Sequence, residues 1–336
     1  MKMKPSIAQY GSLATHRAFL KKPPRSHKIT PFPCNEKDVF STQVAGLVKR
    51  LKSIKCRDCV IGLSGGLDST LALLVTFAAF QKLHLDKCGI HVYTMPGFGT
   101  TKRTKSNAEI LATDLGLKIE SISIVKACQQ HFRDIGHDGK TPDVTFENAQ
   151  ARMRTMILMD KANMTNGIVI GTGDMSEIAL GWCTYNGDHM SMFGVNSGVP
   201  KTIIRKVCAW WAAANRKTYP KAAQAITDII ATPISPELVK GQVTEDKIGS
   251  YELHDFFLWN FIMNEMGTKD LQSAAERYFG SVFSAAEISR TLMTFMRRFF
   301  TQAFKRNCAP DGIKVFPFEL SLHDWWIPSD LGIVKL

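Results

Sequence analysis

The chain has 336 residues, of which 45% are hydrophobic, and its formal net charge is +12. This length allows one large or two ordinary domains with a sizeable core. The longest apolar run, near residues 71–80, is too short to cross a bilayer, and the basic N-terminus lacks the continuous apolar stretch of a secretory signal. We therefore expect no membrane partner.

The positive charge is concentrated at the N-terminus. Residues 1–35 contain seven Lys or Arg residues and no acid, so they contribute +7 of the net charge. The modest excess elsewhere suits a pocket for polyphosphate substrates, and we expect no nucleic-acid partner. Eight scattered cysteines favour a reduced, cytoplasmic protein. The close pair Cys56 and Cys59 has no further ligands placed for zinc, so we interpret it as incidental.

In chain order, the sequence predicts alternating strands and helices after an irregular leader. Five prolines and little periodicity predict the leader over residues 1–34, and Asn35 can cap the first helix. Helices are predicted over residues 36–52, 68–82, 102–115 and 146–163, and strands over 59–63, 89–94, 118–124 and 168–171. This alternation is typical of an α/β fold with a doubly wound parallel sheet. Beyond residue 200 the pattern is helical, over residues 203–217, 222–231, 251–265 and 285–304.

The first strand runs into a glycine-rich turn, Ser64–Ser69, with the sequence S-G-G-L-D-S. Glycines let the backbone approach a ligand closely, and the N-terminus of the following helix attracts anions, so we interpret the turn as a phosphate site. It is not a P-loop, because no Lys follows the second glycine. The alternative interpretation is an ordinary strand-to-helix turn.

Two acids follow predicted strand ends, Asp68 in this turn and Glu177 in the stretch G-T-G-D-M-S-E after residue 170. Ligands of doubly wound sheets bind outside the carboxyl ends of the strands, so both acids are expected in one cleft. Carboxylates together with substrate phosphates commonly hold Mg²⁺, and a Mg²⁺ site is our interpretation. The alternative is that each acid caps a helix or faces its dipole.

Three further stretches offer ligand contacts. Asn148 and Arg152 are four residues apart, on one helix face that suits a polar anionic ligand or is merely solvated. Trp182 and Tyr185 can stack on a ring or belong to the core. Lys201 follows a proline at a predicted helix start, where it can reach a phosphate or remain a surface lysine.

Together these stretches resemble the synthetase domain of the glutamine-dependent NAD⁺ synthase family. The first turn, S-G-G-L-D-S-T, is shared across the ATP pyrophosphatase superfamily, which has an adenine nucleotide alpha hydrolase-like fold. The remaining motifs are specific to NAD⁺ synthases: M-P-G-F-G-T-T, E-N-x-Q-A-R-x-R, G-T-G-D-x-S-E-x-A-L-G-W-x-T-Y, G-V-P-K-T and, at residues 252–257, E-L-H-D-F-F. The similarity spans about residues 31–330. We therefore expect a synthase domain over 35–330, preceded by the leader and followed by a tail over 331–336.

The resemblance implies ATP-dependent amidation of deamido-NAD⁺ through an acyl-adenylate, which makes the protein a ligase that uses Mg²⁺. By match to the family motifs, the catalytic residues are Asp68, Glu177 and Lys201, and the metal ligands are Asp68 and Glu177. The implied ATP-binding residues are Ser64, Gly65, Gly66, Leu67, Asp68, Ser69, Thr172, Lys201 and Ser235. The implied deamido-NAD⁺-binding residues are Asn148, Arg152, Glu177, Trp182, Cys183, Thr184, Tyr185 and Lys305.

One departure from the family concerns the nitrogen source. Glutamine-using members carry a nitrilase-like glutaminase domain before the synthetase part, and here only some 35 basic, proline-rich residues precede it. We therefore expect ammonia as the nitrogen donor, supplied free or by a separate glutaminase subunit, or else a truncated chain. The resemblance also implies a homodimer or larger homo-oligomer. Two other functions stay open at this point, a tRNA-modifying ATP pyrophosphatase and an inactive nucleotide-binding fragment.

Overall fold

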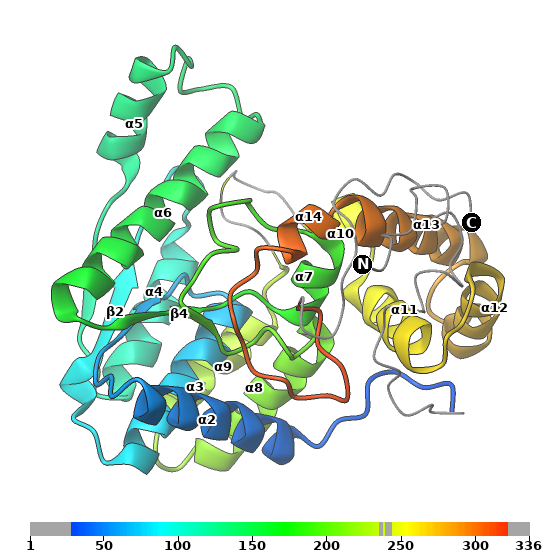
Figure 1. Cartoon of the computed structure of the whole chain (residues 1–336), viewed down its shortest axis with the longest axis horizontal. Coiled ribbons are helices and arrows are strands. Elements are labelled where there is room, and N and C mark those ends of the chain that lie inside the picture. The colour runs from blue at the N-terminus through cyan, green and yellow to red at the C-terminus, as the bar shows by residue number, and fades with distance from the viewer. Residues whose placement is uncertain (1–27, 235–237, 239–243, 322–336) are drawn as a thin grey trace, which may run out of the picture.

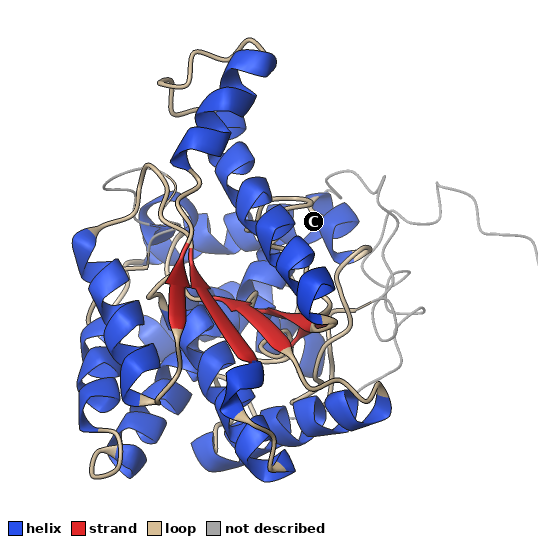
Figure 2. Ribbon diagram, turned by 90° about the vertical axis from the view of Figure 1, so that its left-hand side faces the viewer, coloured by secondary structure: helices blue, strands red, loops and turns tan. Residues whose placement is uncertain are grey.

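The computed structural model describes residues 28–234, 238 and 244–321. At its centre lies a parallel sheet of five strands in the order β3-β2-β1-β4-β5. The strands are β1 (Cys59–Gly62), β2 (Ile90–Thr94), β3 (Ile119–Ser121), β4 (Ile168–Gly171) and β5 (Phe193–Gly194). Figure 2 shows this sheet between helices on both sides. The predicted doubly wound α/β fold is therefore confirmed.

The strand order places the switch point of the fold between β1 and β4. From β1 the chain moves through β2 to β3 on one side, and it then returns to β4 and β5 on the other. Cys59 pairs with Ile90 of β2 on one side and with Ile168 of β4 on the other. In such sheets, the connections after the two strands that flank the switch point leave a crevice between them. These connections are the Ser64–Ser69 turn and the loop that precedes Glu177.

Successive side chains of the strands pack alternately into two separate hydrophobic cores. In β1, Cys59 and Ile61 belong to the larger hydrophobic cluster, whereas Val60 belongs to the smaller one. Ile168 and Val169 of β4 divide in the same way. All of them are buried, because helices cover both faces of a parallel sheet, and this explains the nearly continuous apolar runs of these strands.

One face of the sheet is covered by packed helices, and the other by a long helix and a short one. The larger core includes α2 (Glu36–Ser53), α3 (Leu67–Leu83), α4 (Lys102–Asp114), α8 (Lys201–Asn215) and α9 (Pro220–Ile230). The smaller core includes α5 (Val125–Asp134) and α6 (Val144–Thr165). In Figure 1, α5 and the adjoining end of α6 project from the rest of the molecule. The long α6 packs directly against β1 and β4, so its side chains lie beside the switch point.

The C-terminal part of the chain is helical, as predicted. Its helices are α10 (Thr244–Ile248), α11 (Tyr251–Met263), α12 (Thr268–Phe279), α13 (Ala285–Thr301) and α14 (Ala303–Arg306). Every residue of α11 except Glu252 is buried, because α7 (Met175–Leu180), α8, α12 and α13 surround it. Thus α11, α13 and α14 pack against α7, the helix that follows β4. None of the described helices combines the length and hydrophobicity needed to cross a bilayer.

Most predicted elements are confirmed within a few residues, and the differences have local reasons. The third strand, predicted over 118–124, is only Ile119–Ser121, an exposed edge strand. Sequence reasoning missed α5, which buries only two of its residues, and β5, which has two residues. It also missed the short helices α7, α10 and α14, together with α12.

Part of the predicted leader and the whole predicted tail lie outside the described residues. Within the leader, residues 28–34 are described. Phe32 is buried, and its ring centroid lies 4.9 Å from that of Trp259 and 5.0 Å from that of Phe316. The packed part of the chain therefore reaches at least to Phe32, two residues before the predicted boundary.

Candidate active site

The Ser64–Ser69 turn follows β1 and opens α3. Gly65 has a φ of +87°, and a Cβ on it would lie 2.1 Å from the carbonyl oxygen of Thr104. Only glycine combines this left-handed backbone with so close an approach, so the packing of the turn against α4 requires glycine at this position. Gly66 is the N-cap of α3 and offers the helix no side-chain hydrogen bond. A helix N-terminus of this kind can receive an anion.

The two serines stiffen the turn. The Ser64 and Ser69 hydroxyl oxygens lie 3.1 Å apart, and the Gly66 N–H donates to Ser64 Oγ at 3.0 Å. The Ser69 hydroxyl also donates to the Gly66 carbonyl at 3.1 Å. Leu67 packs into the larger core, so its side chain holds the turn and only its backbone can serve a ligand. The local hydrogen bonds thus preorganise the turn without a ligand.

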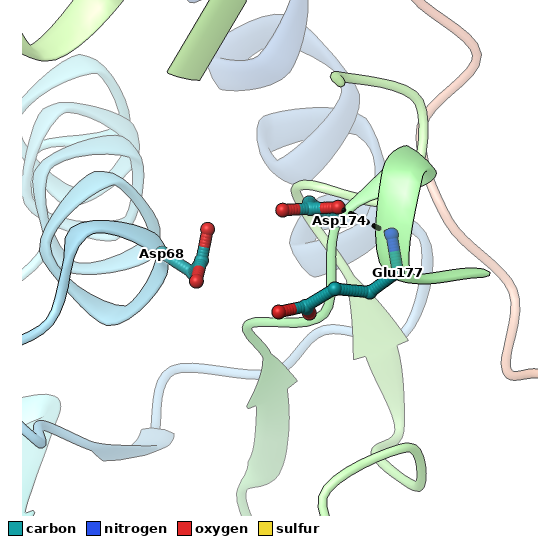
Figure 3. Close-up of side chains that lie close together, drawn as sticks. All are labelled: Asp68, Asp174 and Glu177. Atoms are coloured by element: carbon teal, nitrogen blue, oxygen red, sulfur yellow. Dashed lines mark hydrogen bonds between the residues drawn. The ribbon is translucent and has the colours of Figure 1, made fainter. Parts of the chain in front are cut away.

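The loop after β4 supplies two acids. Asp174 is the N-cap of α7, and its Oδ1 accepts a hydrogen bond of 2.8 Å from the Glu177 N–H. Sequence reasoning singled out Glu177 and missed Asp174, although an acid three residues before a Glu at a helix start is a recognisable capping pattern. Figure 3 shows Asp68 of α3 facing Asp174 and Glu177 of α7. The predicted pair of acids is therefore brought together, with a third carboxylate beside it.

Lys201 lies among these three carboxylates. Its Nζ is 2.6 Å from Asp68 Oδ2, 2.7 Å from Asp174 Oδ2 and 2.9 Å from Glu177 Oε1. The Lys201 side chain is only 2% exposed, and Pro200 sets it at the first position of α8. We call Asp68, Asp174, Glu177 and Lys201 the acid–lysine cluster. The surface-lysine alternative for Lys201 is wrong, because α8 begins inside the fold.

Burial and mutual repulsion perturb the pKa values of Glu177 and Asp174. Burial raises the pKa of Glu177 to about 7, the charge of Asp68 adds to the rise, and the ammonium of Lys201 opposes it. The pKa of Asp174 is raised well above its ordinary value for the same reasons. The pKa of Lys201 is raised well above its ordinary value, because attraction to the three acids outweighs the effect of burial. Strongly perturbed groups that gather in a cleft are typical of functional sites.

The donor set of the cluster fits a hard cation. One oxygen from each of Asp68, Asp174 and Glu177 lies within 4.8 Å of the others. The buried Oδ1 of Asp68 has no hydrogen-bond partner among the described residues. Carboxylate oxygens with spare acceptor capacity are the ligands that Mg²⁺ takes in proteins. The predicted ligands Asp68 and Glu177 can therefore hold such an ion, with Asp174 beside them.

A cleft of about 550 Å³ opens above the cluster, at the carboxyl ends of β1, β2 and β4. Its wall includes eleven of the residues predicted to bind the substrates or the metal: Ser64, Gly66, Asp68, Ser69, Asn148, Thr172, Glu177, Trp182, Cys183, Thr184 and Lys305. Residues from motifs more than a hundred positions apart therefore share one cavity. Of the other predicted residues, Gly65, Leu67, Arg152, Tyr185 and Lys201 are not part of this wall, and Ser235 lies outside the described residues.

Two of the predicted motifs touch directly in this cleft. The Thr184 hydroxyl donates to Asn148 Oδ1 at 2.9 Å, which joins the loop after α7 to α6. One helical turn further along α6, Arg152 Nε donates to the Tyr185 carbonyl at 3.3 Å. The side chains of Arg152 and Tyr185 are exposed beside the cleft. Asn148 and Arg152 therefore share one face of α6, as their spacing predicts, and the contact of this face with a ligand stays a prediction.

Cations from the C-terminal helices hold the loop that carries Trp182 and Cys183. Lys305 Nζ donates to the carbonyls of Gly181 at 2.9 Å and Cys183 at 2.7 Å. The guanidinium of Arg298 lies over the Trp182 ring, 4.9 Å from its centroid, and donates to the Leu180 carbonyl. Sequence reasoning missed Arg298, since nothing local links residues 118 positions apart. Arg154 was also missed; it lines the cleft and donates from Nε to the Met95 carbonyl.

Comparison with known proteins identifies the family of the chain. The sequence model of the NAD synthase family matches residues 39–291 of the chain. The chain belongs to the NAD synthase family. Among its relatives, the glutamine-dependent NAD(+) synthetases of Mycobacterium bovis and Mycobacterium leprae are 36% and 37% identical to it. Each alignment covers 88% of the chain and 48% of the relative, so the chain spans about half the length of the curated relatives it matches.

Solved structures with names from this family share the fold. The glutamine-dependent NAD(+) synthetase from Cytophaga hutchinsonii superposes with a TM-score of 0.69 over 88% of the chain and 54% of that protein, at 17% identity. The NH3-dependent NAD synthetase from Campylobacter jejuni gives 0.54 over 81% of the chain and 96% of that protein, at 19% identity. At these identities the likeness concerns the arrangement of the elements. These structures therefore support the fold of the chain.

Proposed function

We propose that the chain catalyses the ATP-dependent amidation of deamido-NAD⁺ to NAD⁺, which makes it a ligase that forms a carbon–nitrogen bond. The nicotinate carboxylate attacks the α-phosphorus of ATP and pyrophosphate leaves. Ammonia then attacks the acyl-adenylate and AMP leaves. The observation that carries the proposal is that the Ser64–Ser69 turn and two acids of the acid–lysine cluster, Asp68 and Glu177, line one cleft at the switch point of the sheet.

For the adenylylation step, the chain's task is to hold and neutralise the triphosphate. The Ser64–Ser69 turn, Thr172, Lys201 and Ser235 are proposed to contact ATP. When bound by Asp68 and Glu177, Mg²⁺ would supply charge neutralisation at the phosphates. No side chain needs to act as the nucleophile, because the substrate's own carboxylate attacks, so positioning and electrostatic stabilisation provide the catalysis.

For deamido-NAD⁺, we propose the opposite side of the cleft. The contact between Asn148 and Thr184 places the α6 motif and the loop after α7 on one wall, where an amide and a hydroxyl face the cavity. The proposed contacts are Asn148, Arg152, Glu177, Trp182, Cys183, Thr184, Tyr185 and Lys305. Of these, Arg152 and Tyr185 suit the end of the dinucleotide that leaves the cleft, because they are exposed beside it.

The nitrogen is proposed to be ammonia, taken free or delivered by a separate glutaminase. We also propose that residues 35–330 act as the synthetase unit and that the chain forms a homodimer or larger homo-oligomer. Both statements rest on the resemblance to the family. Sedimentation of the purified protein would test the second, and a monomer at micromolar concentration that retains full activity would contradict it.

One assay tests the reaction. The purified protein is incubated with Mg-ATP, deamido-NAD⁺ and ammonium chloride, and AMP, pyrophosphate and NAD⁺ are measured by chromatography. The proposal predicts the three products in equal amounts, and omission of deamido-NAD⁺ should remove AMP formation. Failure to form NAD⁺ in a protein that binds ATP would contradict the proposal and favour an inactive nucleotide-binding chain.

Two added arms separate the alternatives. Release of AMP that requires tRNA would indicate the tRNA-modifying function instead. Replacement of ammonium by glutamine tests the nitrogen source, and we expect little activity with the chain alone. Efficient glutamine use by the purified chain would contradict the proposed ammonia dependence while leaving the amidation reaction intact.

A further inference from the structure

The N-terminus of α8, which carries Lys201, is capped by residues of other elements. Its N-cap is Pro200, whose side chain cannot accept a hydrogen bond. The N–H groups of Ile203 and Ile204 donate to the Pro200 carbonyl at 2.9 and 3.0 Å. The first two N–H groups, those of Lys201 and Thr202, find their acceptors outside α8. A buried helix end needs such partners, because unpaired backbone groups there are costly.

Those acceptors connect α8 to α7 and α11. The Lys201 N–H donates to Ser176 Oγ at 2.8 Å, and the Thr202 N–H donates to Asp255 Oδ2 at 3.0 Å. The Thr202 hydroxyl donates to the same oxygen at 2.7 Å, and the Ser176 hydroxyl donates to Asp255 Oδ1 at 2.5 Å. Ser176 stands directly before Glu177. One carboxylate therefore joins the first turn of α7, with its two acids, to the first turn of α8, with its lysine.

Asp255 is placed to act only through these contacts. It is 2% exposed, lies on α11 and does not line the cleft. Tyr251, one turn earlier on the same helix, lies under the lysine, with its ring centroid 5.4 Å from Lys201 Nζ. Asp255 is the last residue of the sequence E-L-H-D at residues 252–255, and Tyr251 directly precedes that sequence. The proposed reaction assigns no role to this stretch. The side of α11 that carries Tyr251 and Asp255 therefore packs beneath the acid–lysine cluster.

We propose that Asp255 is a positioning residue that sets the spacing between Glu177 and Lys201 by capping α8 and fastening α7 with one carboxylate. This inference rests on the proposed function, since the spacing matters only if the cluster binds the metal and the triphosphate. A displacement of about 1 Å at a reacting centre can lower a rate by about 100-fold. The two oxygens of Asp255 thus control the geometry of a site that they do not touch.

The experiment compares four variants of the full chain. Asp255→Ala removes both oxygens, Ser176→Ala removes the bridge to Lys201, and Asp255→Asn keeps an acceptor for Thr202. Asn260→Ala is the matched control, because Asn260 is equally buried on α11 and donates two hydrogen bonds, to the carbonyls of Thr30 and Phe256. For each variant, kcat for NAD⁺ formation is measured well below the melting temperature, together with the rise in Tm on addition of Mg²⁺ alone.

We expect Asp255→Ala to lower kcat by about 100-fold and Ser176→Ala by about tenfold, and both to lose the Mg²⁺-induced rise in Tm. Asp255→Asn should recover most of both, and Asn260→Ala should lower Tm while keeping both. If Asp255→Ala does not fold, Ser176→Ala decides. Equal behaviour of Ser176→Ala and Asn260→Ala would overturn the inference. Absence of NAD⁺ formation by the wild type, with an intact Mg²⁺ response, would instead count against the proposed function.

Discussion

Lys201 Nζ lies 2.6 Å from Asp68 Oδ2, and this contact joins the first turns of α3 and α8 beneath the cleft. The same ammonium is within 3 Å of Asp174 and Glu177. A single ammonium group thus contacts all three carboxylates of the cluster. Its removal should affect stability and function through the same electrostatic interaction.

Lys201→Met should destabilise the protein by about 3–5 kcal/mol, because three carboxylates would remain close together without their partner. Added Mg²⁺ should restore part of the lost stability, because it supplies positive charge among the same three carboxylates. Urea unfolding with and without Mg²⁺ measures both effects. An unchanged free energy of unfolding, or a loss that Mg²⁺ does not reduce, would contradict the role of Lys201 as counter-charge.

Asp68→Asn should lower kcat by about 10²–10³-fold while the far-UV circular dichroism stays that of the wild type. The substitution removes one carboxylate from the cluster but keeps the side-chain shape. Asp58→Asn is a suitable control, because Asp58 lies at the opposite end of β1 and forms a half-exposed pair with His91. Turnover equal to that of the control would show that Asp68 does not hold the metal.

Glu177 should make Mg²⁺ binding pH-dependent. Its folded-state pKa is raised to about 7, so between its ordinary value and pH 7 the folded protein holds a proton that the unfolded chain has released. Ionisation of Glu177 therefore costs stability as the pH rises toward 7. Since Mg²⁺ needs the ionised carboxylate, its affinity should rise from pH 5.5 to 7.5 and then level off. Calorimetric titration of Mg²⁺ tests this, and Glu177→Gln should flatten the profile.

His254 should produce a pH dependence of stability with the opposite sign. Burial in α11 lowers its pKa to about 4, while its Nε2 bonds to the Ile248 carbonyl at 2.8 Å. The unfolded chain therefore binds a proton below pH 6.5 that the folded protein refuses. Up to about 3 kcal/mol of stability should disappear between pH 6.5 and pH 4. His254→Gln should reduce this slope in urea unfolding measured across that range, and an unaltered slope would contradict the assignment.

The local part of the site was predictable from the sequence. The Ser64–Ser69 turn, the strand before it and the helix after it follow from two glycines between apolar runs. Asp68 and Glu177 could be brought together because parallel strands expose their carboxyl ends on one edge. The identities of the substrates came from resemblance, since no spacing of residues specifies a nicotinate or an adenine.

The non-local part was not predictable, for physical reasons. Arg298 reaches the loop after α7 from more than a hundred residues away, through side-chain contacts that leave no periodic signal. Lys305, which contacts the same loop, was named only by resemblance to the family. Asp174 was hidden by its second role as a helix cap. Short elements such as β5 bury too few residues for any pattern to emerge. These contacts and short elements depend on tertiary packing, which local sequence patterns do not encode.

The acid–lysine cluster also bears on how the chain acquires its function. Lys201 and Asp68 are 133 positions apart, and Tyr251 and Asp255, which pack beneath them, belong to α11, later still in the chain. Contacts of such long range form late, because the entropy of closing the intervening chain is lost before they are made. A nascent chain that has completed β1 and its glycine turn therefore carries Asp68 but still lacks Glu177 and Lys201 beside it. The acid–lysine cluster is therefore complete only when α8 and α11 have packed against α3 and α7.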